Sequence, residues 1–130
     1  MLLHGRLLYA RERWKDAEQV LAPLAGDSAN VVSYLGYRGV IAARLGDWEA
    51  ARSYAAQLEN LDRPFPYQRG PITHWRADIT ALLGDNEETV RLLHQAMNEG
   101  IGWGMWLHTD MDLEPLHGFP PFEEMMRPEG

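Results

Sequence analysis

The sequence predicts an all-α fold in which three antiparallel helix pairs follow one another along the chain. The first observation is that apolar side chains between residues 31 and 63 recur at steps of three and four, the spacing of one helix face. The second is that Gly46 and Asp47 interrupt this spacing, and they suit the end of one helix and the N-cap of the next. The third is that the same arrangement recurs on both sides of this stretch.

The central pair is expected over residues 30–63. Its apolar or small positions are Val32, Leu35, Gly39, Ala42 and Leu45 in the first helix and Trp48, Ala51, Tyr54, Ala55, Leu58 and Leu61 in the second. The turn between the helices is so short that they must lie antiparallel. Small residues such as Gly39 and Ala51 on the facing sides predict a close approach. Because one pair cannot bury its outer face alone, it needs similar pairs beside it.

The first pair is expected over residues 1–29, with helices at about 2–11 and 14–22. One shift of the sequence places several matching residues on one another: Trp14 on Trp48, Ala17 on Ala51, Gly5 on Gly39 and Leu24 on Leu58. Glu12 and Arg13 stand where the central pair has glycine and aspartate. The matched tryptophans are expected to be packing residues, because equivalent positions of a repeat have equivalent surroundings.

The third pair is expected over residues 70–99, with helices at 72–83 and 86–99. A slightly longer shift places Gly84 and Asp85 on Gly46 and Asp47, Ala77 on Gly39, and Thr89 on Ala51. The preceding residues 62–71 contain three prolines and a glycine, which disfavour a helix. Phe65 and Tyr67 in this connection either form a binding loop or cover the end of a helix pair.

Residues 100–130 are expected to cap the third pair. Gly100, Gly102 and Gly104 interrupt any helix, and Thr109 and Asp112 have the spacing of a capping box, which predicts a short helix there. Pro121 suits the first turn of a last helix. The third pair leaves an apolar face at Val90, Leu93 and Met97, and stacked helix pairs need a cap on such a face. The apolar residues available to cover it are Trp103, Trp106, Leu113, Leu116 and Phe122.

The period of about 34 residues, the small residue in each first helix and the alanine in the second resemble the tetratricopeptide repeat over about residues 1–99. The tail resembles the C-terminal ends of bacterial tetratricopeptide proteins, including arrays that follow kinase or cyclase domains. The matching tail residues are His108, Asp110, Leu113, Leu116, Pro120, Phe122 and Pro128. The resemblance implies one domain over residues 1–130, a right-handed solenoid with repeats at about 1–29, 30–63 and 70–99 and an irregular cap at 100–130. No kinase or cyclase sequence is present, so no catalytic residue carries over.

In such arrays the first helix of each pair lines a concave surface that binds a protein or peptide. The residues that the resemblance places there for partner binding are Arg6, Tyr9, Val40, Arg44, His74 and Asp78. Arrays that grip a C-terminal carboxylate use lysine and asparagine at positions where this chain has Gly36, Val40, His74 and Asp78, so that clamp is disfavoured. The expected function is therefore a non-catalytic interaction module or scaffold. A structural end-cap of a longer array is the alternative.

No catalytic, cofactor or metal residue is expected. His108, Asp110 and Asp112 alternate like the first ligands of a calcium loop, and His117 is a further candidate ligand, but the turn glycine and the distal glutamate are missing. A metal-binding or enzymatic protein that uses these three residues is the less favoured alternative. The sequence also lacks an HExxH pair, a GxSxG elbow and a phosphate-binding glycine loop.

The net charge of −7 argues against binding a nucleic-acid backbone, which needs a basic face, and it also favours solubility. No apolar run approaches the roughly 18 residues of a membrane helix. The chain has no cysteine, so it has no disulfide scaffold. Gly5 and Arg6 interrupt the apolar N-terminus and make it a poor secretion signal. We expect a cytoplasmic protein without a nucleic-acid or membrane partner, and a homo-oligomer remains open.

Overall fold

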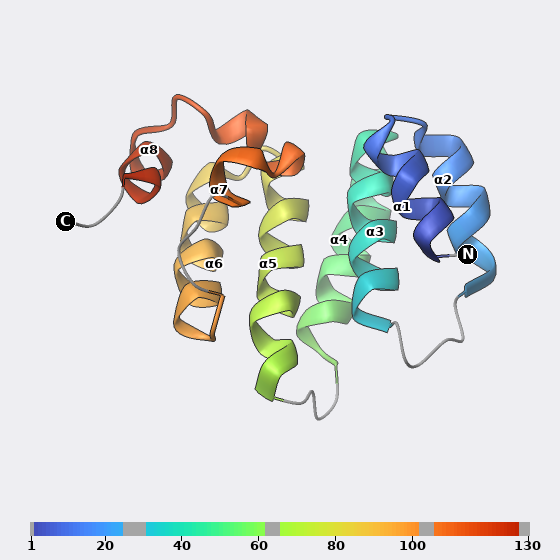
Figure 1. Cartoon of the computed structure of the whole chain (residues 1–130), viewed down its shortest axis with the longest axis horizontal. Helices are drawn as coiled ribbons and strands as arrows, with labels where there is room; N and C mark the ends of the chain where they lie inside the picture. The colour runs from blue at the N-terminus through green and yellow to red at the C-terminus, as the bar shows by residue number, and fades with distance from the viewer. Residues whose placement is uncertain (1, 25–30, 62–65, 102–105, 128–130) are drawn as a thin grey trace. The chain divides into compact units, whose positions relative to one another are not determined.

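The computed structural model describes residues 2–24, 31–61, 66–101 and 106–127. Every regular element within these ranges is a helix, which confirms the all-α class (Figure 1). In chain order the elements are α1 (Leu2–Ala10), α2 (Trp14–Leu21), η1 (Ala22–Leu24), α3 (Val31–Arg44), α4 (Trp48–Glu59), α5 (Pro66–Leu82), α6 (Asn86–Asn98), α7 (Trp106–Thr109), η3 (Met111–Leu116) and α8 (Pro120–Met126). Among the described helices, none has the length and apolar character that crossing a membrane requires.

The chain divides into two compact units, Met1–Asp62 and Arg63–Gly130, and each is described by itself. The first unit contains the helix pairs α1/α2 and α3/α4, and α2 also packs against α3. The second unit contains the pair α5/α6 and the tail elements α7, η3 and α8. A single domain over residues 1–130 stays a prediction.

The three helix pairs share one turn geometry. The N–H groups of Glu12, Gly46 and Gly84 donate to the carbonyl oxygens of Tyr9, Ala43 and Ala81 at 2.9, 3.1 and 3.1 Å. The N–H groups of Arg13, Asp47 and Asp85 donate to the carbonyl oxygens of Leu8, Ala42 and Thr80 at 2.9, 2.9 and 3.1 Å. This double pattern is the Schellman motif, which satisfies the last carbonyl groups of a helix. The two shifts that align the pairs in the sequence therefore also align their backbone hydrogen bonds.

The predicted caps and close contacts are also present. Asp47 and Asp85 cap α4 and α6 by accepting from the N–H groups three residues later, at 3.1 and 3.2 Å. The matched positions Ala17, Ala51 and Thr89 are all fully buried. A Cβ atom on Gly5 would lie only 2.5 Å from the Leu21 side chain, so α1 and α2 cross closely there. The small residues chosen by spacing thus mark real helix contacts.

Two local expectations for the helix pairs are wrong. Trp48, the first residue of α4, is not a core residue, because it is 48% exposed and its side chain is in contact with solvent. Residues 66–71 are helical, although they contain two prolines and a glycine. Proline suits the first helical position, which Pro66 occupies, while Pro71 lies inside the helix. An internal proline costs about 3 kcal/mol, and the apolar burial of Ile72 beside it contributes stability in the opposite direction.

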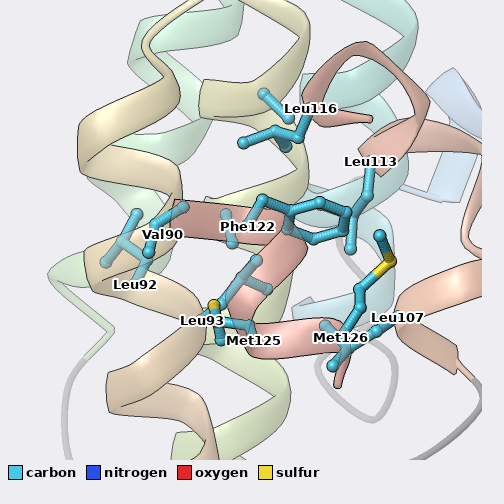
Figure 2. Close-up of a cluster of buried hydrophobic side chains, with 11 residues drawn as sticks. Val90, Leu92, Leu93, Leu107, Leu113, Leu116, Phe122, Met125 and Met126 are labelled. Atoms are coloured by element: carbon cyan, nitrogen blue, oxygen red, sulfur yellow. The ribbon is translucent and has the colours of Figure 1, made fainter. Parts of the chain in front are cut away.

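The tail covers the third helix pair as expected. Figure 2 shows Phe122 of α8 among side chains from α6 and from the tail. The buried cluster consists of Ala77, Ala81, Val90, Leu92, Leu93, Leu107, Leu113, Leu116, Phe122, Met125 and Met126, with Met97 and Phe119 packed against it. Trp103 and the side chain of Trp106 lie outside the described residues, as does Phe65 of the expected binding loop. The predicted capping role of Leu113, Leu116 and Phe122 is confirmed.

The start of the short tail helix differs from the prediction by one residue. Asp110, rather than Thr109, caps η3, and its Oδ1 accepts from the Asp112 N–H at 2.9 Å. Thr109 is the last residue of α7. A carboxylate is a strong N-cap, so Asp110 takes this position in place of the neighbouring hydroxyl. The last helix begins with Pro120 and Pro121, as expected for prolines in a first turn.

Candidate functional site

The second unit brings one imidazole and two carboxyl groups together. His74 and Asp78 are four residues apart on α5, a spacing that puts both side chains on one helix face. Asp110 is the N-cap of η3, which packs against α5. Its cap hydrogen bond uses Oδ1 and leaves Oδ2 directed at α5. The local structure of η3 therefore orients the third member of this group, which we call the His–Asp cluster.

The distances within the His–Asp cluster are short. His74 Nε2 lies 2.9 Å from Asp110 Oδ2 and 3.5 Å from Asp78 Oδ1. One nitrogen or oxygen atom from each of the three side chains lies within 4.8 Å of the other two. The side chains of His74, Asp78 and Asp110 are 26%, 6% and 13% exposed, so the cluster is largely shielded but reaches solvent through the imidazole.

The surroundings of Asp110 favour its charged form. Burial alone raises the pKa of this carboxyl group, but several interactions outweigh burial and lower the pKa below its usual value. They are hydrogen bonds from His74 and Asp78, the charge of His74 and the backbone N–H of Asp112. A hydrogen bond between Asp78 and Asp110 requires a proton on one of the two carboxyl groups. The cluster therefore joins titratable groups that come from two separate elements, α5 and η3.

Of the residues considered as metal ligands from the sequence, only Asp110 belongs to the cluster. His108 is exposed and Asp112 is buried, and within the described residues neither joins a group of potential ligands. His117 stacks on Phe122 with ring centroids 5.7 Å apart. The sequence placed His74 and Asp78 on one helix face but carried no local signal that Asp110 would meet them. That contact depends on how the tail folds back onto α5.

In the first unit, Arg44 is held by aromatic side chains. Its guanidinium carbon lies 4.9 Å from the Trp14 ring centroid and 5.9 Å from that of Tyr9. Its Nε donates to the Tyr9 hydroxyl at 3.3 Å. Tyr9 also packs against the ring of Tyr37 at 5.7 Å. These contacts join α1, α2 and α3, so Arg44 and Tyr9 have a structural role whether or not they also bind a partner.

The predicted partner residues differ in their exposure. Arg6 is exposed, while Tyr9 is buried and Val40 is fully buried within the structure. Tyr9 and Val40 therefore do not offer an open surface to a partner. His74 and Asp78, which were also predicted to bind a partner, belong to the His–Asp cluster of the second unit. The six residues thus fall into four in the first unit and two in the second.

Leu3 and Leu7 form an exposed apolar stripe on α1 that was not predicted. Leu3 is 65% and Leu7 51% exposed, and Ala10 continues this face one turn later. Arg6 lies beside them on the same side of the helix, because it follows Leu3 by three residues. The spacing of four between the leucines was visible in the sequence, but it is equally typical of a buried helix face.

No protein-family model, curated protein or solved structure matches this chain. Over the residues that the structure describes, the chain is all-α and contains three helix pairs, with a helical tail packed on the third. Two features stand out among the described residues: the exposed apolar stripe on α1 and the largely buried, polar His–Asp cluster.

Proposed function

We propose that this protein is a non-catalytic interaction module that binds a protein or peptide partner through a tetratricopeptide-like array. The repeated turn is the observation that carries this proposal. Three helix pairs share the same Schellman hydrogen bonds and the same buried position in the second helix, at Ala17, Ala51 and Thr89. In this proposal the three pairs form a right-handed solenoid, the fold that the resemblance in the sequence implies.

The partner contacts are assigned to α1. Leu3 and Leu7 supply apolar area and Arg6 supplies a charge that can pair with a carboxylate. Residues 1–13 contain three arginines and one glutamate, in a chain whose net charge is −7. This basic stretch attracts acidic segments that the rest of the chain repels. The partner is therefore a peptide segment that carries leucine-like side chains beside aspartate or glutamate.

Tyr9 and Arg44 contribute by holding α1 in place. Because Arg44 lies against the rings of Tyr9 and Trp14, a change at Arg44 disturbs the packing of α1 as well as the local charge. Arg6 is the cleaner probe of binding, since its exposed side chain can be changed without altering the core.

The test is a selection of random peptides displayed on phage against the immobilised chain. We expect enrichment of acidic peptides with leucine or isoleucine, measured afterwards as free peptides by fluorescence polarisation. Arg6→Glu should weaken the binding about tenfold, because it replaces an attraction with a like-charge repulsion. Arg52→Glu on α4 is the matched control, since Arg52 is also exposed, and it should leave the affinity unchanged.

If the affinity of the selected peptides falls equally with Arg6→Glu and with Arg52→Glu, the result would contradict a binding site on α1. A selection without any enrichment over bare resin would contradict peptide binding itself. Melting temperatures of both variants, followed by circular dichroism, should equal that of the parent.

A further inference from the structure

The His–Asp cluster has a composition and a geometry that the interaction module does not require. We propose that His74, Asp78 and Asp110 bind one divalent transition-metal ion of the zinc class. The ion would join the tail to α5, because two of its ligands come from α5 and the third from the start of η3. This site is independent of the partner surface on α1.

The separations within the cluster fit a metal ion. Zinc lies about 2.1 Å from nitrogen and oxygen ligands, so two ligands at tetrahedral or square angles are about 2.9–3.4 Å apart. His74 Nε2 is 2.9 Å from Asp110 Oδ2 and 3.5 Å from Asp78 Oδ1. The remaining pair of ligand atoms is at most 4.8 Å apart and needs only a side-chain adjustment to close around an ion.

Charge also favours a divalent ion. Two carboxyl groups lie together at a site where their side chains are only 6% and 13% exposed. A protonated His74 can neutralise one carboxylate, whereas an ion of charge two can neutralise both and leave the imidazole neutral as a ligand. Both carboxyl groups lie near the same ring nitrogen, so one ion can contact all three side chains.

The ligand set indicates which ions fit. One imidazole nitrogen and two carboxylate oxygens suit zinc, cobalt or manganese, while calcium and magnesium prefer oxygen ligands alone. The Asp112 N–H holds Oδ1 of Asp110 at 2.9 Å and so orients its other oxygen, as outer partners of metal ligands commonly do. Three protein ligands leave a coordination position for water or for a side chain of a partner, and the 26% exposure of His74 provides the access.

The experiment uses the untagged full chain after dialysis against a chelator. Titration with zinc chloride in a calorimeter should show one equivalent bound, and magnesium chloride should show none. His74→Gln, Asp78→Asn and Asp110→Asn each remove a ligand and should each weaken zinc binding at least about tenfold. His108→Gln is the matched control, because His108 is exposed and lies two residues from Asp110, and it should bind zinc like the parent.

Cobalt gives a readout that does not depend on any variant. The unmodified chain with one equivalent of cobalt chloride should develop the intense visible absorption of four- or five-coordinate cobalt, and zinc should displace it. A spectrum identical to that of cobalt in buffer would overturn the site. So would zinc affinities that fall equally for His108→Gln and for the three ligand variants, each confirmed to be folded by circular dichroism.

Discussion

Glu12 adopts a backbone conformation that the other two turns give to glycine. Its φ is 61°, beside 83° for Gly46 and 86° for Gly84. The hydrogen bonds of the first turn are the same as in the other two, so the chain keeps the turn despite the side chain. An ordinary residue in this left-handed region costs roughly 1–2 kcal/mol, because its Cβ crowds the following carbonyl group.

Glu12→Gly should therefore stabilise the protein. Glycine removes the crowding, which raises the free energy of unfolding. Glycine also gives the unfolded chain more conformational freedom, which lowers it, so the net increase should be roughly 0.5–1 kcal/mol. The measurement is urea unfolding followed by circular dichroism. Gly46→Ala is the reciprocal control and should destabilise by a similar amount. Equal stabilities for the parent and Glu12→Gly would mean that the first turn relaxes to another conformation.

Thr89 shows how a polar residue replaces alanine at a buried repeat position. It is fully buried where the first two pairs have Ala17 and Ala51. Its hydroxyl donates to the Asp85 carbonyl oxygen at 2.7 Å and lies 2.8 Å from the Thr80 hydroxyl. A buried hydroxyl is tolerated when it is hydrogen-bonded, so the weaker match in the sequence still gives an equivalent packing position.

At the scale of single elements, the two tryptophans that begin α2 and α4 in the first unit differ in their burial. Trp14 begins α2, is half-buried and contacts both Tyr9, with ring centroids 4.8 Å apart, and Arg44. Trp48 begins α4 and is 48% exposed. The matched spacing thus predicted the same residue type at the same helical position, but only one of the two tryptophans has neighbours that cover it.

Trp48→Ala should cost about 1 kcal/mol or less, because about half of the side chain already contacts water. Trp14→Ala should cost more, about 2–3 kcal/mol, since it also removes the contacts with Tyr9 and Arg44. Urea unfolding of the two variants and the parent at one pH measures both losses. A larger loss for Trp48→Ala than for Trp14→Ala would contradict the exposure that separates them.

At the scale of the whole chain, the tail contributes side chains to the hydrophobic core of the third helix pair. Phe122, Leu113 and Leu107 are fully buried, and they join a cluster that includes Ala77 of α5 and Leu93 of α6. The members of this cluster are distant in sequence, so the third pair and the tail should gain their stability together.

Ending the chain after Glu99 should uncover this apolar face. We expect a lower melting temperature and aggregation, measured by calorimetry and light scattering, because newly exposed apolar surface associates with other copies. Phe122→Ala keeps the chain length and should lower the free energy of unfolding by about 3–5 kcal/mol. A truncated chain that is monomeric and as stable as the parent would contradict a structural role for the tail.

The sequence alone was enough to predict the helices of the three pairs except for the start of α5, the turns within the pairs and the aspartate caps of α4 and α6, because these depend on residues close together in the chain. The spacing of apolar residues, the glycines at positions 46 and 84 and the aspartates that follow them act within one or two helical turns. The same local signals indicated which part of the tail would cover the third pair.

Only the tertiary structure decided which residues are exposed and which polar groups meet. Whether Trp48 is covered depends on neighbours from other elements, and the helix across Pro71 depends on the burial of Gly70 and Ile72 around it. Asp110 meets His74 across 36 residues because the tail folds back onto α5. Such a contact leaves no periodic signal, since it depends on the path of the chain and not on the spacing of residues within one helix.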